Sequence, residues 1–278
     1  MTTRLVLQTR AADYATLERL AQQAGATRTT RLSDHALRAE GLERDPALIE
    51  AAHALAVDAC YLPAGQSLAD FKLVAMDMDS TLITIECIDE IADMQGLKPR
   101  VAEITEAAMR GELDFSESLR RRVALLKGLD FGALQRVYDE RLQISLGGEA
   151  MLAAVKAAGL KTLLVSGGFT FFTERLQARL GLDYTHANTL EVEDGRLTGR
   201  VLGTIVDAEE KKRSVERVCA EMGIATSQAI VMGDGANDLK MMGIAGLSVA
   251  FRAKPVVRLQ ASIALNYVGL DGVVTALR

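Results

Sequence analysis

After residue 70, short apolar runs alternate along the chain with stretches in which apolar residues recur at helical spacing. The apolar runs predict buried strands at Lys72–Met76, Lys161–Val165, Ala229–Met232 and Leu247–Phe251. The stretches between them predict helices at Glu149–Ala158, Thr170–Leu180 and Ala208–Met222. Strands that alternate with helices are typical of a mostly parallel sheet covered on both faces, so the pattern predicts an α/β, doubly wound, Rossmann-like core.

The alternation is interrupted between the first and second strands by residues 86–145, which have almost purely helical periodicity. Four helices are expected there, at Ile88–Gln95, Pro99–Met109, Phe115–Leu126 and Phe131–Leu142. We interpret this block as a helical cap inserted into the core. Further along, "TLEVEDGRLTGRVLG" alternates around Asp194-Gly195 and predicts a β-hairpin.

Residues 1–70 have a different pattern and predict a small α+β accessory domain with a linker. A strand is expected at Arg4–Gln8 and helices at Ala12–Gln23 and Pro46–Cys60, whereas "RTTRLSDHALRAEGLERDP" is polar and weakly periodic. This segment could bind a small regulator such as an amino acid, or mediate dimerisation, and its sequence favours neither. The predicted domains are therefore 1–70, a core formed by 71–85 and 146–278, and a cap at 86–145.

Composition narrows the class of protein. The chain has 278 residues, a net charge of -5, no Trp and no long run of Lys or Arg, so nothing indicates a nucleic-acid partner. No apolar stretch is long enough to cross a bilayer, and the N-terminus has no signal-peptide core. The three cysteines, Cys60, Cys87 and Cys219, are widely spaced and are expected to be buried, reduced thiols. We expect a cytoplasmic protein with no membrane partner.

Three of the predicted strands end in polar loops: Asp77-Met78-Asp79, Ser166-Gly167-Gly168 and the stretch 233–238, "GDGAND". Because the carboxyl ends of parallel strands meet at one edge, these loops should open onto one face. Carboxylates gathered there would repel each other without a cation. All candidate ligands are oxygens, which favours a hard cation such as Mg²⁺.

This set of groups is suited to phosphoryl transfer. The P-loop pattern is absent, so a carboxylate could act as the nucleophile, with a second acid two residues away as general acid and base. A receiver-type phospho-switch also combines a phosphoacceptor Asp with an acidic Mg²⁺ site, but such modules are about half this size and lack a cap. A serine hydrolase centred on Ser166 is disfavoured because no G-x-S-x-G frame surrounds it.

"DMDST", "SGG", a downstream lysine and "GDGAND" together resemble the haloacid dehalogenase-like phosphohydrolases. Together "DMDSTLITIECIDEIA", "MRGELDFSESLRRRVALLKGL", "LLVSGGFTFF" and "VMGDGANDLKMM" resemble the phosphoserine phosphatase family within that superfamily. The resemblance covers about residues 72–278. It implies Mg²⁺-dependent hydrolysis of L-phosphoserine through an aspartyl-phosphate, the last step of serine biosynthesis. A related phosphatase or phosphotransferase acting on phosphothreonine, phosphohomoserine or another small phosphomonoester is the alternative.

The same resemblance assigns roles to residues of the core. Asp77 matches the nucleophile and Asp79 the general acid and base. The metal ligands would be Asp77, the backbone carbonyl of Asp79 and Asp234. Asp238 matches an indirect or water-mediated metal contact, or it is simply an acid in the first turn of a helix.

The remaining matches concern phosphate and substrate. The residues implied near the phosphate are Ser166, Gly167, Lys211 and Asn237, and those implied around the rest of the substrate are Glu86, Arg122, Met109 and Phe115. Glu86 would receive the ammonium group and Arg122 the carboxylate of a phosphoamino acid. Several of these also have a structural interpretation: Lys211 or Lys212 could belong to a solvated charge run, Asn237 could cap a helix, and Arg122 could lie on a solvated helix face. A homodimer is possible.

Overall fold

A computed structural model describes residues 3–110 and 112–278 of the chain, without the side chain of Met109. The described chain forms two sheets, a smaller one from residues 3–63 and a larger one from residues 73–265. The smaller sheet belongs to the N-terminal segment and has the order β2-β3-β1-β4, with antiparallel pairs throughout. Its elements are β1 (Thr3–Thr9), α1 (Tyr14–Gln23), β2 (Thr29–Ser33), β3 (Ala36–Leu42), α2 (Pro46–Ala54) and β4 (Val57–Pro63). This βαββαβ order is that of a ferredoxin-like unit.

The larger sheet has seven strands in the order β11-β10-β9-β5-β6-β7-β8 and is parallel except for the β7–β8 hairpin. Its strands are β5 (Leu73–Met76), β6 (Lys161–Phe169), β7 (Tyr184–Glu193), β8 (Arg196–Leu202), β9 (Ala229–Gly233), β10 (Leu247–Phe251) and β11 (Ile263–Leu265). The chain leaves β5 for β6 on one side and later returns to β9 on the other side. The carboxyl ends of β5, β6 and β9 therefore surround the point at which the strand order reverses, where ligands bind in such sheets.

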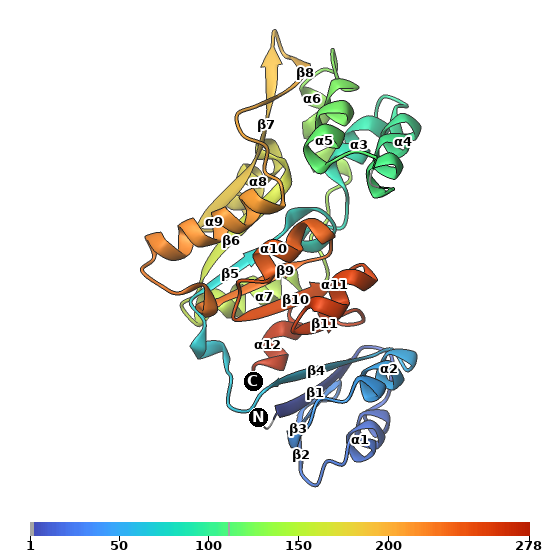
Figure 1. Cartoon of the computed structure of the whole chain (residues 1–278), viewed down its shortest axis with the longest axis vertical. Helices are drawn as coiled ribbons and strands as arrows, with labels where there is room; N and C mark the ends of the chain where they lie inside the picture. The colour runs from blue at the N-terminus through green and yellow to red at the C-terminus, as the bar shows by residue number, and fades with distance from the viewer. Residues whose placement is uncertain (1–2, 111) are drawn as a thin grey trace.

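Helices cover both faces of this sheet (Figure 1). Alternate residues of β5 point to opposite faces: Val74 and Met76 belong to one buried cluster, Leu73 and Ala75 to another. The first cluster includes side chains of α7 (Gly148–Ala157), α8 (Thr170–Leu180) and α12 (Gly272–Ala276). The second includes side chains of α9 (Ala208–Glu221), α10 (Leu239–Met242) and α11 (Pro255–Gln260). The predicted doubly wound α/β fold is thus confirmed.

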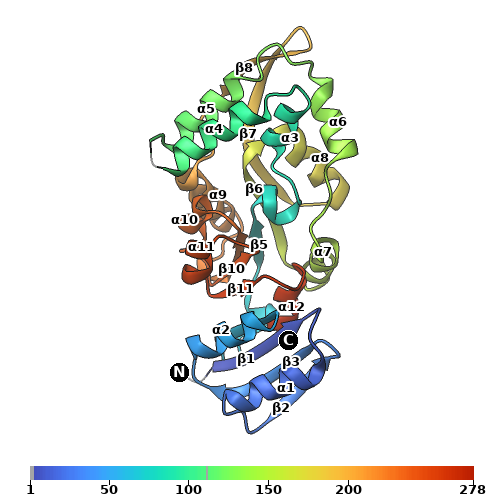
Figure 2. The ribbon, with the colours of Figure 1, turned by 90° about the vertical axis from the view of Figure 1, so that its right-hand side faces the viewer.

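A layer of helices lies beyond the carboxyl edge of the sheet and corresponds to the predicted insertion. It contains α3 (Cys87–Asp93), α4 (Lys98–Met109), α5 (Phe115–Ala124) and α6 (Gly132–Glu140). The β7–β8 hairpin extends from the core and reaches these helices (Figures 1 and 2). Leu197 is joined to the helical layer by two backbone hydrogen bonds, from Gly128 N and to Leu129 O, at 2.8 and 2.9 Å. The hairpin therefore supports this layer.

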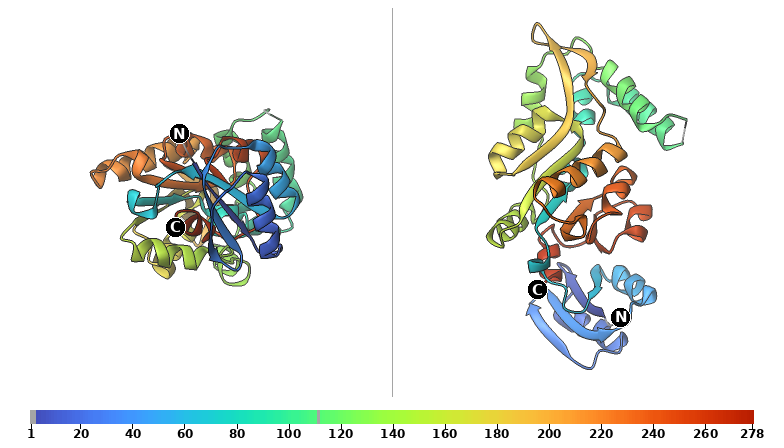
Figure 3. Two further views of the ribbon diagram at one scale, coloured as in Figure 1. Left: turned by 90° about the horizontal axis from the view of Figure 1, so that it is seen from below. Right: turned by 60° about the vertical axis from the view of Figure 1, so that its left-hand side comes forward.

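The N-terminal sheet packs against the end of the core opposite to the helical layer (Figure 3). Val6, Cys60 and Leu62 belong to the same buried cluster as the C-terminal residues of the core. Asp58 is buried and accepts hydrogen bonds from the backbone N–H groups of residues 266–268 at 2.8 to 3.1 Å. This contact fixes the N-terminal unit far from the carboxyl edge of β5.

Several expected elements differ from the observed ones. The helix expected at Pro46–Cys60 ends at Ala54, because Ala56 has a φ of 56° and begins a turn into β4. The polar stretch before it forms β2 and β3, where the edge strand β2 exposes most of its residues and so lacks an apolar pattern. The strand expected at Lys161–Val165 continues to Phe169 and includes the "SGG" residues. Within the described ranges, no helix has both the length and the apolar character that a membrane span requires.

Candidate active site

Asp77 and Asp79 lie at the carboxyl end of β5, in the centre of the large sheet. The N–H group of Asp77 donates to the carbonyl of Met232 on β9 at 3.0 Å, so the backbone still pairs with its neighbour where the carboxylate begins. The turn that follows, Met78–Leu82, contains Ser80 at a φ of 55°, a left-handed conformation that non-glycine residues rarely adopt. This tight turn returns the chain over the strand end and leaves both carboxylates beside one cavity.

Lys211 lies beneath Asp77, fully buried, on the first turn of α9. Its Nζ is 2.8 Å from Asp77 Oδ1 and 2.8 Å from Asp238 Oδ1. Burial alone would lower the pKa of this ammonium, but Asp238 and Asp77 outweigh burial and raise the pKa, so Lys211 stays charged. Lys212 instead pairs with Glu216 at 3.6 Å, so Lys211 is the lysine of this pair that contacts Asp77 and Asp238.

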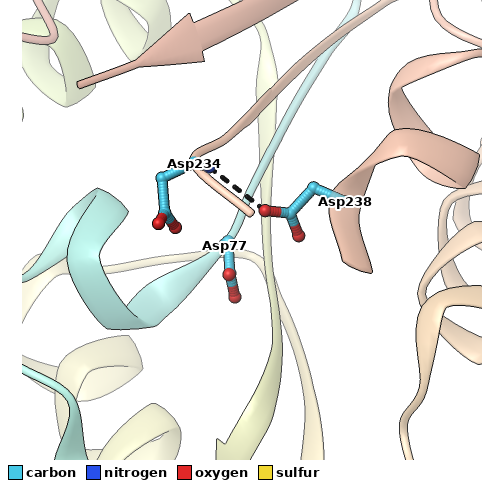
Figure 4. A group of neighbouring side chains, drawn as sticks. All are labelled: Asp77, Asp234 and Asp238. Atoms are coloured by element: carbon cyan, nitrogen blue, oxygen red, sulfur yellow. Dashed lines mark hydrogen bonds between the residues drawn. The ribbon is translucent and has the colours of Figure 1, made fainter. Parts of the chain in front are cut away.

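Asp234 and Asp238 complete an acidic cluster with Asp77 (Figure 4). One ligand atom from each of the three carboxylates lies within 4.8 Å of the others. Both oxygens of Asp238 are already used: Oδ1 faces Lys211, and Oδ2 accepts from the N–H groups of Asp234 and Gly235 at 3.1 and 3.0 Å. Asp238 therefore holds the backbone that presents Asp234. Thr81 Oγ1 also orients Asp234, donating to its Oδ1 at 3.3 Å.

The charges of this cluster fit a divalent cation. Burial, followed by Asp238 and Glu86, raises the pKa of Asp234 to about 6. Burial and Asp238 also raise the pKa of Asp77, against the opposing effect of Lys211. The single positive charge of Lys211 therefore does not balance the three carboxylates of Asp77, Asp234 and Asp238. Two of them, Asp77 and Asp234, retain an oxygen that accepts no hydrogen bond from the described residues, so these two can coordinate an ion.

Asp79 lies in a different environment from Asp77. Burial and the negative charge of Glu86 raise the pKa of Asp79 to about 8. Its carboxyl group faces Gly168 on β6 so closely that a Cβ at Gly168 would lie 3.0 Å from Asp79 Oδ2 and 2.8 Å from Met78 Cε. The site thus contains a carboxyl that holds a proton at neutral pH two residues from one paired with a lysine, as general acid catalysis requires.

Ser166 and Gly167 form the wall of the cavity on the β6 side. Ser166 is fully buried, and its Oγ accepts from Gly168 N at 2.8 Å. Asn188, a residue that the sequence did not single out, donates through Nδ2 to the carbonyl of Gly167 at 2.8 Å and fixes this turn. A Cβ at Gly167 would lie 2.9 Å from Phe115 Cζ, so only glycine allows the ring from α5 to approach this closely.

The helical layer contributes the opposite wall. Phe115 and Arg122 lie on one face of α5, two turns apart, and both line the cavity. Arg122 is half-buried, whereas its neighbours Arg120 and Arg121 are exposed, so the solvated-face interpretation does not hold for Arg122. Burial lowers the pKa of Arg122, while nearby carboxylates, Asp89 first, oppose this effect. Glu86 precedes α3 at the cavity mouth, where its Oε1 accepts from Ser80 Oγ at 2.6 Å.

The cavity enclosed by these walls has a volume of about 610 Å³. Nine of the residues singled out from the sequence line it: Asp77, Asp79, Glu86, Phe115, Arg122, Ser166, Gly167, Asp234 and Asn237. Lys211 and Asp238 lie behind this lining, and the side chain of Met109 lies outside the described residues. Two charged residues that the sequence did not single out, Asp89 and Lys254, also line the cavity. Lys254 follows the predicted strand Leu247–Phe251, so its position at a strand end was a usable signal.

The raised pKa values predict a pH-dependent stability in the metal-free protein. The folded state binds protons at Asp79 and Asp234 more tightly than the unfolded chain, where their ordinary value is 3.8. Their stabilising effect is complete below about pH 4 and is lost as the pH rises through about 6 and 8. Between pH 5.5 and 8.5 we expect the free energy of unfolding in EDTA to fall by about 4 kcal/mol, most of it from Asp79.

Chemical denaturation at the two pH values, with and without MgCl₂, measures this effect. The added cation should stabilise the protein more at pH 8.5 than at pH 5.5, because the carboxylates are then ionised. A metal-free stability that rises with pH, or an equal effect of MgCl₂ at both values, would contradict this account of the cluster.

Comparisons with known proteins agree with this geometry. The family model for haloacid dehalogenase-like hydrolases matches residues 74–243. A phosphoserine phosphatase of Polaromonas sp. is 59% identical over 209 residues, which cover 73% of this chain and 89% of that protein. A solved HAD family hydrolase of Salmonella enterica serovar Typhi superposes with a TM-score of 0.88 at 33% identity, covering 100% of this chain and 99% of the other.

A probable phosphoserine phosphatase from Vibrio cholerae, solved without ligand, superposes with a TM-score of 0.84 at 36% identity. The superposition covers 99% of this chain and 86% of the other, so it includes the N-terminal segment. Sequence, fold and the carboxylate–lysine arrangement therefore lead to one conclusion: this chain belongs to the haloacid dehalogenase-like hydrolases, among the phosphoserine phosphatases.

Proposed function

We propose that this protein hydrolyses L-phosphoserine to L-serine and phosphate, with Asp77 as the nucleophile and Mg²⁺ as the cofactor. The observation that carries the proposal is a division of charge within one cavity. Asp77, with the acidic cluster and Lys211, lies at the core side, whereas Glu86 and Arg122 lie on the side of the helical layer. The core side suits a phosphoryl group, and the other side suits the ammonium and carboxylate of an amino acid.

The first step is attack by Asp77 on phosphorus. Lys211 and the N–H group of Met78 hold the carboxylate of Asp77 in place through Oδ1, so that while one of its two oxygens stays available to the metal, the other attacks. The new bond joins this oxygen to phosphorus as the bond from phosphorus to the serine oxygen breaks. Asp79, whose raised pKa keeps it protonated, gives its proton to the departing oxygen of serine.

The second step reverses the role of Asp79. As a carboxylate it takes a proton from water, and the water oxygen bonds to phosphorus while the bond from Asp77 to phosphorus breaks. Phosphate then leaves, and both carboxyl groups return to their starting states. The hydroxyl of Ser166, the N–H group of Gly167 and the ammonium of Lys211 are the groups we assign to phosphate binding, and Asn237 also lines the cavity.

Mg²⁺ would be held by Asp77, Asp234 and the backbone carbonyl of Asp79, and when bound it supplies positive charge that neutralises these carboxylates and the phosphate. Asp238 supports this site through the backbone of residues 234 and 235. We also place the protein in the cytoplasm, in keeping with three cysteines that are all free and buried.

A panel of small phosphomonoesters tests the choice of substrate. L-Phosphoserine should be hydrolysed faster than phosphothreonine, phosphohomoserine or phosphoethanolamine, and only when Mg²⁺ is present. Preference for phosphothreonine or phosphohomoserine would favour the alternative, a related phosphatase. Absence of turnover with every substrate would favour a phospho-switch.

Arg122→Ala should selectively impair substrates that carry a carboxylate. A charge-assisted contact to a carboxylate contributes about 1.5–3 kcal/mol, so kcat/KM for phosphoserine should fall roughly 10- to 100-fold. For phosphoethanolamine, which lacks the carboxylate, the change should stay within about threefold. Arg120→Ala, an exposed position on the same helix, is the control and should leave both substrates unaffected. An equal loss on both substrates would contradict the role assigned to Arg122.

A further inference from the structure

Asp89 is one of two charged residues lining the cavity, with Lys254, that the proposed reaction does not use. It lies one turn after Glu86, on the first turn of α3, and its side chain lines the same cavity. Among the described residues, no hydrogen bond or ion pair within 4.0 Å involves its carboxylate. Its neighbour Glu90 pairs with Arg141 at 2.6 Å and with Lys98 at 3.6 Å, which ties α3 to other helices of the layer. Glu90 therefore has a structural partner, and Asp89 faces the cavity without one.

The electrostatic partner of Asp89 is Arg122. Burial raises the pKa of Asp89, and Arg122 is the charge that opposes this effect most strongly. In turn, Asp89 is the carboxylate that most strongly stabilises the charge of the partly buried Arg122. The two groups are thus near neighbours, although no nitrogen-to-oxygen distance between them falls within 4.0 Å. Both residues line the cavity, so a ligand bound there lies within reach of both charges.

The position of Asp89 has opposite effects on the two charges of an amino acid. A substrate carboxylate bound at Arg122 lies near Asp89 and is repelled by it. The α-ammonium of the same substrate would lie between the carboxylates of Asp89 and Glu86, and both would attract it. Glu86 already accepts a hydrogen bond from Ser80 through one oxygen, and Asp89 offers a second carboxylate as an acceptor for a group with three N–H donors.

We propose that Asp89 is a specificity-determining residue that selects zwitterionic substrates, attracting the α-ammonium and rejecting phosphate esters that carry a carboxylate without it. This inference rests on the proposed phosphatase function of the same cavity. Arg122 alone would bind any phosphate ester that carries a carboxylate. Asp89 would weaken the binding of those esters that lack the ammonium. Specificity then depends on a repulsive element as well as on attractive ones.

Four substrates that differ only in these two charges separate the possibilities. Phosphoserine has both charges, phosphoethanolamine only the ammonium, 3-phosphonooxypropanoate only the carboxylate, and ethyl phosphate neither. For Asp89→Asn, KM should rise about tenfold for phosphoserine and phosphoethanolamine with kcat changed less than threefold. KM for 3-phosphonooxypropanoate should fall about threefold, and ethyl phosphate should be unaffected. The ratio of kcat/KM for phosphoserine over 3-phosphonooxypropanoate should therefore fall about 30-fold.

Two further variants make the result interpretable. Asp89→Glu keeps the charge and should retain most of the preference for phosphoserine. Asp139→Asn, a surface acid on α6 whose carboxylate contacts Gln135, controls for loss of a negative charge in the helical layer and should leave all four KM values unchanged. Thermal unfolding of each variant checks that the fold is retained.

Distinct outcomes would overturn the proposal. If Asp89→Asn impairs 3-phosphonooxypropanoate as well as phosphoserine but not phosphoethanolamine, Asp89 only positions Arg122. If all four substrates lose equally, its role is structural. If the unsubstituted protein fails to hydrolyse phosphoserine at all, the proposed function itself is wrong, and this result is seen before any variant is tested.

Discussion

Asp77→Asn should abolish turnover of phosphoserine, lowering kcat by at least about 10⁴-fold, because an amide cannot form the acyl phosphate on which both steps depend. The structure predicts that this loss occurs without loss of the fold. Burial and Asp238 raise the pKa of Asp77, so a neutral isostere removes an unfavourable charge from the metal-free protein. In EDTA at pH 8, the variant should be at least as stable as the unsubstituted protein.

The measurement pairs phosphate release with chemical denaturation of the same preparation. Asp139→Asn serves again as the control and should keep full activity. A variant of Asp77 that retains more than a few per cent of the turnover would exclude this residue as the nucleophile. A variant that is inactive because it has unfolded would be recognised by its denaturation curve.

Lys211→Met should impair both catalysis and stability, since Lys211 Nζ lies 2.8 Å from two buried carboxylates. Removing one partner of a buried ion pair leaves an uncompensated charge and costs about 3–5 kcal/mol. Loss of a positive group aimed at the transferred phosphoryl should lower kcat by roughly 10²- to 10³-fold. The stability loss should become smaller as the pH is lowered, because burial and Asp238 raise the pKa of Asp77 and favour its uptake of a proton.

A double variant and a neighbouring lysine make this prediction specific. Adding Asp238→Asn to Lys211→Met removes one of the stranded carboxylates and should recover part of the stability but none of the activity. Lys212→Met affects a partly exposed pair with Glu216 at 3.6 Å and should change stability by less than about 1 kcal/mol. Equal effects of the two lysine variants would contradict the assignment of Lys211 to the site.

The convergence of Asp77, Asp79 and Asp234 could be predicted from the sequence for a simple reason. Asp77 and Asp234 lie directly after short apolar strands, Asp79 lies two residues beyond Asp77, and parallel strands in a doubly wound sheet end at one edge. Strand ends are encoded locally, by the change from apolar to polar residues, so the position of these side chains follows from topology alone. The α/β fold could be predicted for the same reason, because the alternation of strands and helices is also encoded locally.

Other features depend on contacts that local pattern does not encode. Lys211 and Lys212 are adjacent in one charge run, and only the packing of α9 against the sheet buries the first and leaves the second partly exposed. The edge strand β2 was missed because it exposes most of its residues and has no apolar alternation. The inner strand β3 was missed because its buried residues, Ala36, Leu37, Ala39 and Leu42, follow no strict alternation. Asp89 and Glu90 are likewise adjacent acids, and their different surroundings follow from how α3 packs on the layer.

The central claim is that phosphate passes through a covalent bond to Asp77. The most direct measurement is rapid acid quenching during turnover of phosphoserine with Mg²⁺, followed by mass spectrometry of the peptides. The account predicts one phosphoryl group on the peptide that contains Asp77, on Asp77 itself and removable by hydroxylamine. Phosphate found on Ser166, or turnover without any covalent phosphate on the protein, would contradict it.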